Sequence, residues 1–240
     1  MDTPAGGTAS ATAAFFDLDK TIISRSSTLA FAPSFYRHGL INRTQAVRGA
    51  FAQLVFRLGG ADHQQMEHIK EQLTRLCSGW SVERVTEIVV AHLAETIGPL
   101  VYTEAHGLLR AHREAGRDGF IVSTSGQEMV GPIGAMLGAS GIIATQMRHA
   151  AGRYTGDLEF YAYGAGKASR IRELADERGY DLSDCCAYSD SFTDLPMLET
   201  VGHPHAVNPD RQLRKVATAR GWPVLAFAGL SGASCEHPDR

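Results

Sequence analysis

The sequence lacks the features that mark several specialised classes of protein. Its 240 residues include 23 lysines and arginines and 26 aspartates and glutamates, for a formal net charge of −3, so it has no basic excess of the kind that nucleic-acid binding requires. No apolar run approaches the roughly 18 residues that span a bilayer. Residues 1–12 are small and polar, without the charged and hydrophobic regions of a signal peptide. We therefore expect a cytoplasmic protein with a disordered leader over residues 1–12, no membrane span and no nucleic-acid partner.

Cysteine is also scarce, and its spacing excludes two kinds of site. The four cysteines, Cys77, Cys185, Cys186 and Cys235, form no CxxC pair, so the sequence supports neither a zinc site nor a disulfide framework. The adjacent pair lies in an apolar run, where cysteine serves as a small hydrophobe in a strand. Reduced thiols are expected.

Two nucleotide-binding patterns are missing as well. The run Gly-Ala-Gly-Lys-Ala-Ser at residues 164–169 suggests a phosphate loop, but the Walker pattern needs glycine in place of Tyr161 and serine or threonine in place of Ala168. No GxGxxG follows the first predicted strand, so the fingerprint of a dinucleotide-binding domain is absent.

The chain does carry two carboxylates, one residue apart, directly after a short apolar stretch. Phe15, Phe16 and Leu18 suit a buried strand whose carboxyl end opens into a polar loop, which is where open α/β sheets bind their ligands. Asp17 and Asp19 would repel each other there unless a cation joined them. Mg²⁺ prefers such oxygen ligands and commonly accompanies a phosphate.

The rest of the chain divides into a helical block and an alternating region. Residues 26–100 show apolar residues at helical spacing, which predicts helices near 47–58 and 66–76 and a third from about 82 to Gly98-Pro99. Beyond residue 102, predicted helices and strands alternate: helices end near 115 and span 129–137 and 168–178, strands lie at 119–123, 141–144, 185–188, 206–207 and 223–225, and a hairpin lies at 152–156. Alternation of this kind predicts an α/β fold with a mostly parallel sheet. A long insertion after the first strand suits a lid over a site.

Four separated motifs occur in a fixed order along the chain. They are Asp17-Leu18-Asp19-Lys20-Thr21, a DxDxT pattern; Ser123, at the end of an apolar strand; Lys167; and Asp-Ser-Phe-Thr-Asp at residues 190–194. Together they resemble a phosphatase of the haloacid dehalogenase superfamily, in the phosphoserine phosphatase-like subgroup (subfamily IB). The resemblance covers residues 15–227. It implies a three-layer Rossmann-like core over residues 13–23 and 101–240, and a helical cap domain of the C1 type over residues 24–100.

The resemblance also implies roles for the acidic residues. Asp17 would be the nucleophile that forms an aspartyl-phosphate, and Asp19 would protonate the leaving alkoxide and then activate water. Asp17, Asp190 and the backbone carbonyl of Asp19 would hold Mg²⁺. Asp194 would lie close behind, as a water-mediated metal ligand or as a partner of Lys167.

The remaining site residues would bind the phosphate. Lys167 would supply a compact positive charge, Ser123 and Thr193 would donate hydroxyl groups, and the amides of Thr124 and Ser125 would lie at the start of a helix.

Simpler interpretations exist for the same motifs. Lys167 could be a surface lysine that opens a helix, Ser123 could be a helix N-cap, and residues 189–194 could be a turn that only caps the next helix. We interpret His203-Pro204-His205 as turn chemistry in a loop and not as a metal site.

The expected substrate is a small phosphorylated metabolite. Phosphoserine phosphatases place a glutamate early in the cap to bind the substrate amine, and this chain has Ser26 at that position, so L-phosphoserine is not the expected substrate. Arg25, Ser26 and Arg75 could contact another group of the substrate or simply face solvent. The alternatives to a Mg²⁺-dependent phosphatase are a phosphotransferase, a phosphatase of lipid-related phosphomonoesters and, last, a non-catalytic phosphate-binding module.

Overall fold

The computed structural model describes residues 11–41 and 74–231, and its centre is a seven-stranded sheet in the order β4-β3-β2-β1-β5-β6-β7. The strands are β1 (Ala13–Asp17), β2 (Asp118–Gly126), β3 (Gly141–Ala150), β4 (Arg153–Phe160), β5 (Cys186–Ser189), β6 (His203–Val207) and β7 (Val224–Leu225). All neighbouring pairs are parallel except β3 and β4. The predicted α/β fold class with a mostly parallel sheet is therefore confirmed.

Strand β1 lies in the middle of the sheet because both of its faces are apolar. All five of its residues are buried, and consecutive side chains point to opposite faces of a strand. Phe15 stacks on Phe120 on one face (ring centroids 5.7 Å apart), and Phe16 stacks on Tyr188 on the other (4.4 Å). A strand that is buried on both faces requires a helical layer on each side.

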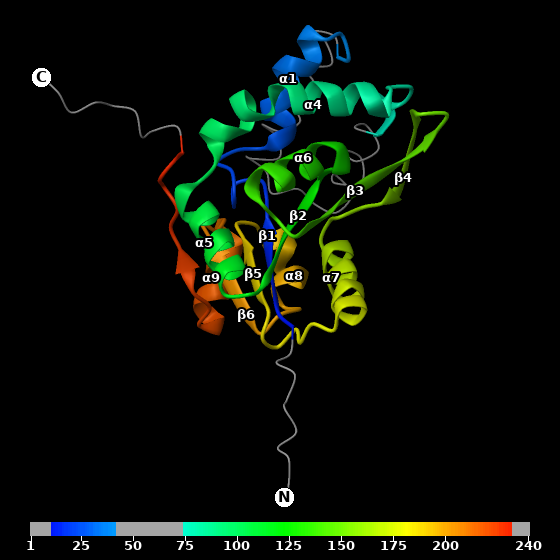
Figure 1. Cartoon of the computed structure of the whole chain (residues 1–240). Helices are drawn as coiled ribbons and strands as arrows, with labels where there is room; N and C mark the ends of the chain where they lie inside the picture. The colour runs from blue at the N-terminus through cyan, green and yellow to red at the C-terminus, as the bar shows by residue number, and fades with distance from the viewer. Residues whose placement is uncertain (1–10, 42–73, 232–240) are drawn as a thin grey trace, which may run out of the picture.

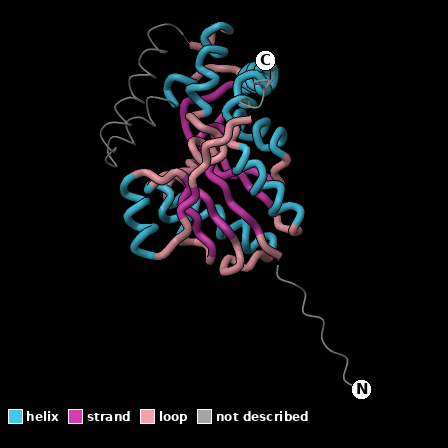
Figure 2. Tube along the Cα trace, turned by 90° about the vertical axis from the view of Figure 1, so that its left-hand side faces the viewer, coloured by secondary structure: helices cyan, strands magenta, loops and turns pink. Residues whose placement is uncertain are grey.

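Helices cover both faces of the sheet, as the side view shows (Figure 2). One layer contains α5 (Thr103–Glu114) and α6 (Gln127–Leu137). The other contains α7 (Ala165–Arg178), the short α8 (Leu195–Leu198) and α9 (Arg211–Arg220), whose apolar residues pack in a second core cluster with Phe15. The architecture is a three-layer α/β sandwich.

The described part of the long insertion is helical and lies beyond the carboxyl end of β1 (Figure 1). It contains α1 (Ser27–Arg37), α4 (Val82–Ile97) and the short 3-10 helix η1 (Gly98–Leu100). Its two connections to the sheet run side by side, because Ser24 N donates to Leu100 O (2.8 Å) and Tyr102 N to Ile22 O (2.9 Å). The insertion therefore stands on a narrow, paired neck.

The helix bounds within the insertion match expectation only in part. The predicted third helix is confirmed as α4, which ends just before Gly98-Pro99. The predicted helix near 47–58 lies outside the described residues, as does most of the one near 66–76, of which residues 74–77 are helical. Helix α1 was not predicted as a separate element; Pro33 inside it is a residue that usually ends helices.

The hairpin is longer than the sequence predicted. Strand β3 extends beyond 144 to Ala150, and the turn falls at Ala151-Gly152, both with positive φ (49° and 73°). That combination suits the right-handed twist of a two-residue hairpin turn. Residues 79–82 of the insertion bond to β4 and the turn, through Gly79 N to Tyr154 O (2.8 Å) and Val82 N to Gly152 O (3.0 Å). The hairpin thus supports the insertion from a second side.

Two further predictions were wrong in detail. The leader prediction extended two residues too far, because Asp181 N donates to Ala11 O (3.2 Å) and Asp118 N to Thr12 O (3.1 Å); residues 1–10 lie outside the described residues. The His203-Pro204-His205 run is part of β6 and not a turn. Proline is tolerated in this strand because β7 pairs only with Ala206 and Val207, which leaves the first half of β6 with a free edge.

Within residues 11–41 and 74–231, we find no helix that combines the length and the apolar character needed to cross a bilayer.

Candidate active site

The parallel register of three strands brings the predicted motifs to one edge of the sheet. Asp17 at the end of β1 pairs with Val122 of β2, so Ser123 follows directly beside it. On the other side Phe16 pairs with Tyr188 of β5, which places Ser189 and Asp190 next to the end of β1. Residues separated by more than 100 positions therefore meet because parallel strands end at the same edge.

Lys167 occupies the centre of this edge and is almost completely buried (1% exposed). Its ammonium donates to Asp17 Oδ1 at 2.7 Å and to Asp194 Oδ2 at 2.8 Å. Burial alone would lower the pKa of Lys167, but the charges of the two carboxylates raise it above its usual range. The lysine is therefore a permanent cation between two acids, and the interpretation of Lys167 as a surface residue is wrong.

Asp194 is oriented toward the lysine by a second donor. Ser189 Oγ donates to the same Oδ2 atom at 2.8 Å, and Asp194 is 3% exposed. Of the two roles expected for Asp194, this geometry favours the partner of Lys167.

Asp17 and Asp190 form a buried pair of like charges. Burial raises the pKa of Asp17, the charge of Asp194 adds to that effect, and Lys167 opposes it. Burial and the charge of Asp17 likewise raise the pKa of Asp190 well above its usual value. A nearby cation is Lys20, whose Nζ lies 3.9 Å from Asp190 Oδ2. A divalent ion bound between the two carboxylates would add positive charge and favour the ionised form of both.

The donor set suits Mg²⁺ better than a metal held wholly by side chains. Within the described part of the chain, no three Asp, Glu, His or Cys side chains converge as a metal site. Two carboxylates, Asp17 and Asp190, would offer oxygen ligands, and the expected third ligand, the backbone carbonyl of Asp19, would keep the set all-oxygen. Mg²⁺ characteristically uses few protein oxygens and keeps several waters.

Asp19 is held separately from this charged group, by neutral donors. Ser27 N donates to Asp19 Oδ1 at 2.9 Å, and Ser125 Oγ lies 3.5 Å from Asp19 Oδ2. Burial raises the pKa of Asp19, and the bonds from Ser27 oppose that rise. The two carboxylates of the DxD motif thus have different environments.

The last residues of β2, 123–126, differ from expectation in their secondary structure. Strand β2 continues to Gly126, which is the N-cap of α6, so Ser123 is not an N-cap, and the amides of Thr124 and Ser125 do not open the helix. Ser123 Oγ accepts from Ser125 N (3.1 Å), and Thr124 Oγ1 donates to Ala162 O (3.1 Å). Ser123 and Ser125 remain at the site edge, whereas the Thr124 hydroxyl joins the end of β2 to the segment that precedes α7.

The loop at residues 189–194 caps a short helix and carries Asp190 and Asp194. Ser191 caps the 3-10 helix η2 (Phe192–Asp194) by accepting from Thr193 N, and the hydroxyls of Ser191 and Thr193 lie 3.0 Å apart. Asp210 holds the loop from outside, since its amide donates to Asp190 O (2.8 Å) and its carboxylate accepts from Phe192 N (2.8 Å). The loop is a cap that also presents Asp190.

Sequence reasoning missed Ser27, Ser189 and Asp210 as neighbours of the site. Asp210 had a local signal, because the Asn-Pro-Asp run before α9 is typical of a helix N-cap. Of the residues considered for the substrate, Arg25 and Arg75 are exposed, and Ser26 is the N-cap residue of α1.

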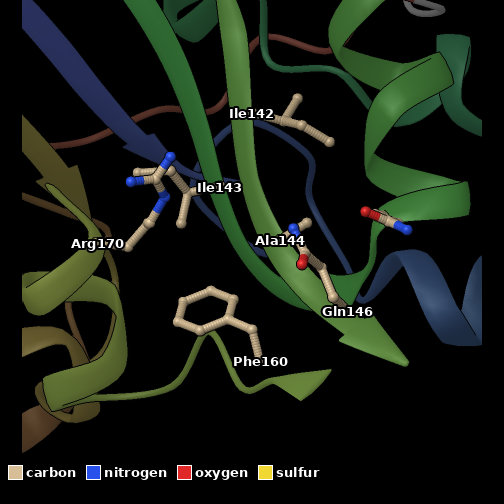
Figure 3. Close-up of a pocket in the computed structure, with 7 residues that line it drawn as sticks. Ile142, Ile143, Ala144, Gln146, Phe160 and Arg170 are labelled. Atoms are coloured by element: carbon tan, nitrogen blue, oxygen red, sulfur yellow. The ribbon is translucent and has the colours of Figure 1, made fainter. Parts of the chain in front are cut away.

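A separate cavity of about 280 Å³ lies at β3 and contains none of the predicted site residues. Figure 3 shows Ile143, Phe160 and Arg170 on one side of the strand and Ile142 on the other. Arg170 is already paired with Glu173 and Glu177, at 3.3 and 2.9 Å. The polar groups that line this cavity therefore carry less unpaired charge than the carboxylate cluster around Lys167. We take that carboxylate cluster as the candidate active site.

Known proteins are similar to this chain in sequence and in fold. The family model of haloacid dehalogenase-like hydrolases matches residues 14–199. The chain is 59% identical over 217 residues to an "inhibition of morphological differentiation protein" of Streptomyces azureus, covering 90% of this chain and 78% of that protein. It is 55% identical over 225 residues to a "probable phosphatase" of Mycobacterium tuberculosis, covering 93% and 78%.

A solved structure of substrate-bound phosphoserine phosphatase shares the fold, with a TM-score of 0.66 at 17% identity and coverage of 90% of this chain and 93% of that one. The expected resemblance to haloacid dehalogenase-type and phosphoserine phosphatase-like proteins is thereby confirmed. The chain belongs to the haloacid dehalogenase-like hydrolase family.

Proposed function

We propose that the protein is a Mg²⁺-dependent phosphatase that hydrolyses a small phosphomonoester through an aspartyl-phosphate on Asp17. The observation that carries this proposal is the contrast within the DxD motif. Asp17 is bound to a buried ammonium at 2.7 Å, while Asp19, two residues later, is held by an amide and a hydroxyl. One anion is positioned to attack, and the other carboxyl group, which has no direct ammonium partner among residues 11–41 and 74–231, is able to exchange a proton.

In the first step, a carboxylate oxygen of Asp17 forms a bond to phosphorus while the bond from phosphorus to the leaving oxygen breaks. Asp19 gives its proton to that oxygen, so an alcohol departs. The buried ammonium of Lys167 offsets the negative charge on the nucleophile and the phosphoryl oxygens. Ser123, at the same edge, would donate its hydroxyl to the phosphoryl group.

In the second step, Asp19 takes a proton from water, and the water oxygen attacks phosphorus. The bond between phosphorus and Asp17 breaks, which releases inorganic phosphate and restores both carboxyl groups. Covalent catalysis of this kind divides one very high barrier into two lower ones.

Asp17, Asp190 and the carbonyl of Asp19 would hold Mg²⁺, which supplies positive charge to the phosphoryl oxygens and to the nucleophile when bound. The buried like charges of Asp17 and Asp190 support this assignment, because both pKa values are raised without the ion. We assign Asp194 to the orientation of Lys167.

We further propose that residues 24–100 form a cap domain on a core made of residues 13–23 and 101–240. The paired neck at Ser24 and Tyr102 supports this division. An insertion placed over the carboxyl end of β1 would exclude water from the reaction.

The test is hydrolysis of p-nitrophenyl phosphate with and without Mg²⁺ by the wild type and by Asp17→Asn, with exposed Asp176→Asn as the matched control. We expect Asp17→Asn to lose activity while its circular dichroism and Asp176→Asn remain as in the wild type. Labelled oxygen from solvent should appear in phosphate. Full activity of Asp17→Asn would overturn the mechanism. If the wild type is active and Asp17→Asn is not, a panel of phosphorylated metabolites tested with the wild type would define the substrate.

A further inference from the structure

Four side chains form a compact polar cluster where the insertion meets the sheet edge. Ser27, the first residue of α1, is fully buried, and Ser125 is 9% exposed. Their hydroxyl oxygens lie 2.8 Å apart, and Thr28 Oγ1 lies 3.4 Å from Ser125 Oγ. The fourth member is Asp19, whose Oδ1 accepts from Ser27 N at 2.9 Å and whose Oδ2 faces Ser125 Oγ at 3.5 Å. Each carboxylate oxygen therefore has a partner from a different segment.

We infer that Ser27 and Ser125 are positioning residues for Asp19, so that the first helix of the insertion completes the acid/base of the reaction. The inference rests on the proposed function, in which Asp19 transfers protons. Ser27 belongs to the insertion and Ser125 to the end of β2. The carboxyl group is thus fixed only when α1 lies against the end of β2.

The backbone of Asp19 is already fixed by the turn in which it lies. Ile22 N and Ile23 N both donate to Leu18 O at 3.0 Å, and Lys20 has a φ of 67°. The turn sets where the Cα atom lies and leaves the carboxyl group to rotate about its own bonds. Orientation of a proton donor matters because transfer requires a short, aligned contact with the leaving oxygen.

The chemistry of the two partners suits a group that must gain and lose a proton. An ammonium in contact with Asp19 would lower its pKa and so favour the carboxylate, as Lys167 does in part for Asp17. An amide and a hydroxyl orient the carboxyl group with no formal charge, and Ser125 Oγ can donate to or accept from it in either state.

A simpler explanation of the same contacts is that Asp19 only caps α1. The amides in the first turn of a helix have no partners within the helix, and a carboxylate near them is favourable. A capping role predicts that loss of the contacts weakens the fold and affects all substrates alike. A positioning role predicts that the loss depends on how much the leaving group needs a proton.

The chain allows the Ser27 amide to be removed without breaking the helix. Proline is well accepted at the first position of a helix, and it requires the preceding residue to be extended. Ser26 is extended, with φ −65° and ψ 128°. Ser27→Pro therefore removes both the N–H and the hydroxyl, Ser27→Ala removes the hydroxyl alone, and Ser125→Ala removes the other partner. Ser34→Ala is the matched control, because Ser34 is buried in the same helix (2% exposed) and bonds to Arg37.

The experiment compares kcat/KM for benzyl phosphate, whose leaving group needs a proton, and p-nitrophenyl phosphate, whose leaving group departs without one. The ratio kcat/KM reports the steps up to departure of the leaving group, so the later attack of water does not enter it. We expect Ser27→Pro to lose ~100-fold with benzyl phosphate, and Ser27→Ala and Ser125→Ala to lose ~10-fold, since general acid catalysis contributes about 10²–10⁴-fold. In each variant the loss with p-nitrophenyl phosphate should be smaller than the loss with benzyl phosphate, and for the two Ser27 variants it should stay below ~3-fold.

Equal losses with both substrates, or the same selectivity in Ser34→Ala, would overturn the positioning role. If Ser27→Pro does not fold, the two alanine variants decide by the same ratio. The proposed function fails by a different result, namely that Asp17→Asn still hydrolyses both substrates.

Discussion

The two aspartates of the DxD motif are held by different parts of the molecule, although only one residue separates them. Asp17 contacts Lys167 of α7, an element of the sheet core, through a buried ion pair of 2.7 Å. Asp19 contacts Ser27 of the helical insertion and Ser125 at the end of β2 through neutral groups. The comparison teaches that two buried carboxyl groups of the same residue type can be held by different partners, one by an ammonium that lowers its pKa and one by neutral groups that orient it.

The largest effect on stability should come from the core side of the site, that is, from the contacts of Lys167 with Asp17 and Asp194. Lys167→Met leaves Asp17 and Asp194 buried beside each other without their cation, and breaking a buried ion pair on one side costs about 3–5 kcal/mol. We expect the free energy of unfolding in urea to fall by that amount. Adding Asp194→Asn to Lys167→Met should restore part of the loss, and a loss below ~1 kcal/mol would show that the lysine does not hold the core side together.

A smaller effect on the unfolding free energy should follow from a change of pH, through His112, which is buried against β1. His112 is 6% exposed and its Nε2 lies 2.9 Å from the Tyr188 hydroxyl. Burial lowers the pKa of His112 to about 4, with Arg117 adding to the effect.

The unfolded chain therefore takes up this proton near pH 6.5, before the folded protein does. The contribution of His112 is fully present above about pH 6.5 and is lost as the pH falls toward 4. Its total is up to ~3 kcal/mol. The difference in unfolding free energy between the wild type and His112→Gln, measured from pH 7 to 4, should shrink by that amount, and a difference that stays constant over this range would contradict the assignment.

Removal of one like charge should stabilise the metal-free protein. Asp190→Asn takes away a buried carboxylate that faces Asp17, so we expect the unfolding free energy without metal to rise by ~1–2 kcal/mol. Mg²⁺ at 100 times its dissociation constant should stabilise the wild type by about 2.7 kcal/mol and Asp190→Asn hardly at all. Equal stabilisation of both proteins would place the ion elsewhere.

The smallest effect concerns Thr21, at the end of the DxDxT pattern. Its Oγ1 is the buried side-chain oxygen that lacks a hydrogen-bond partner within residues 11–41 and 74–231. Thr21→Val keeps the shape and removes the hydroxyl, so the unfolding free energy should rise by about 1 kcal/mol. A loss of stability would mean that the hydroxyl has a partner in solution.

The core side of the site could be predicted from the sequence, whereas the insertion side could not. Asp17, Ser123 and Asp190 each follow an apolar strand, and parallel strands bring such positions to one edge whatever the details of packing. The contact between Ser27 and Ser125 depends on where α1 lies over that edge, and no local pattern encodes that placement. The residue at which a helix starts could not be predicted either, since Gly126 and not Ser123 is the N-cap of α6.

The errors in the outer strands have the same cause, because the pairing of a strand with a distant partner is not encoded in its local sequence. The run His203-Pro204-His205 resembles a turn because proline lacks an amide hydrogen, and only the pairing of β7 shows that this half of β6 has a free edge. The extension of β3 beyond residue 144 likewise depends on its partner β4 and on contacts with the insertion.

The central claim is that the carboxylate held by Lys167, and not the one held by Ser27 and Ser125, carries the phosphoryl group. Borohydride added during turnover of p-nitrophenyl phosphate reduces an aspartyl-phosphate to homoserine, and tandem mass spectrometry of the peptide that contains both aspartates locates it. We predict homoserine at position 17 and unchanged aspartate at position 19. Homoserine at position 19, or neither residue reduced while phosphate is released, would contradict the account.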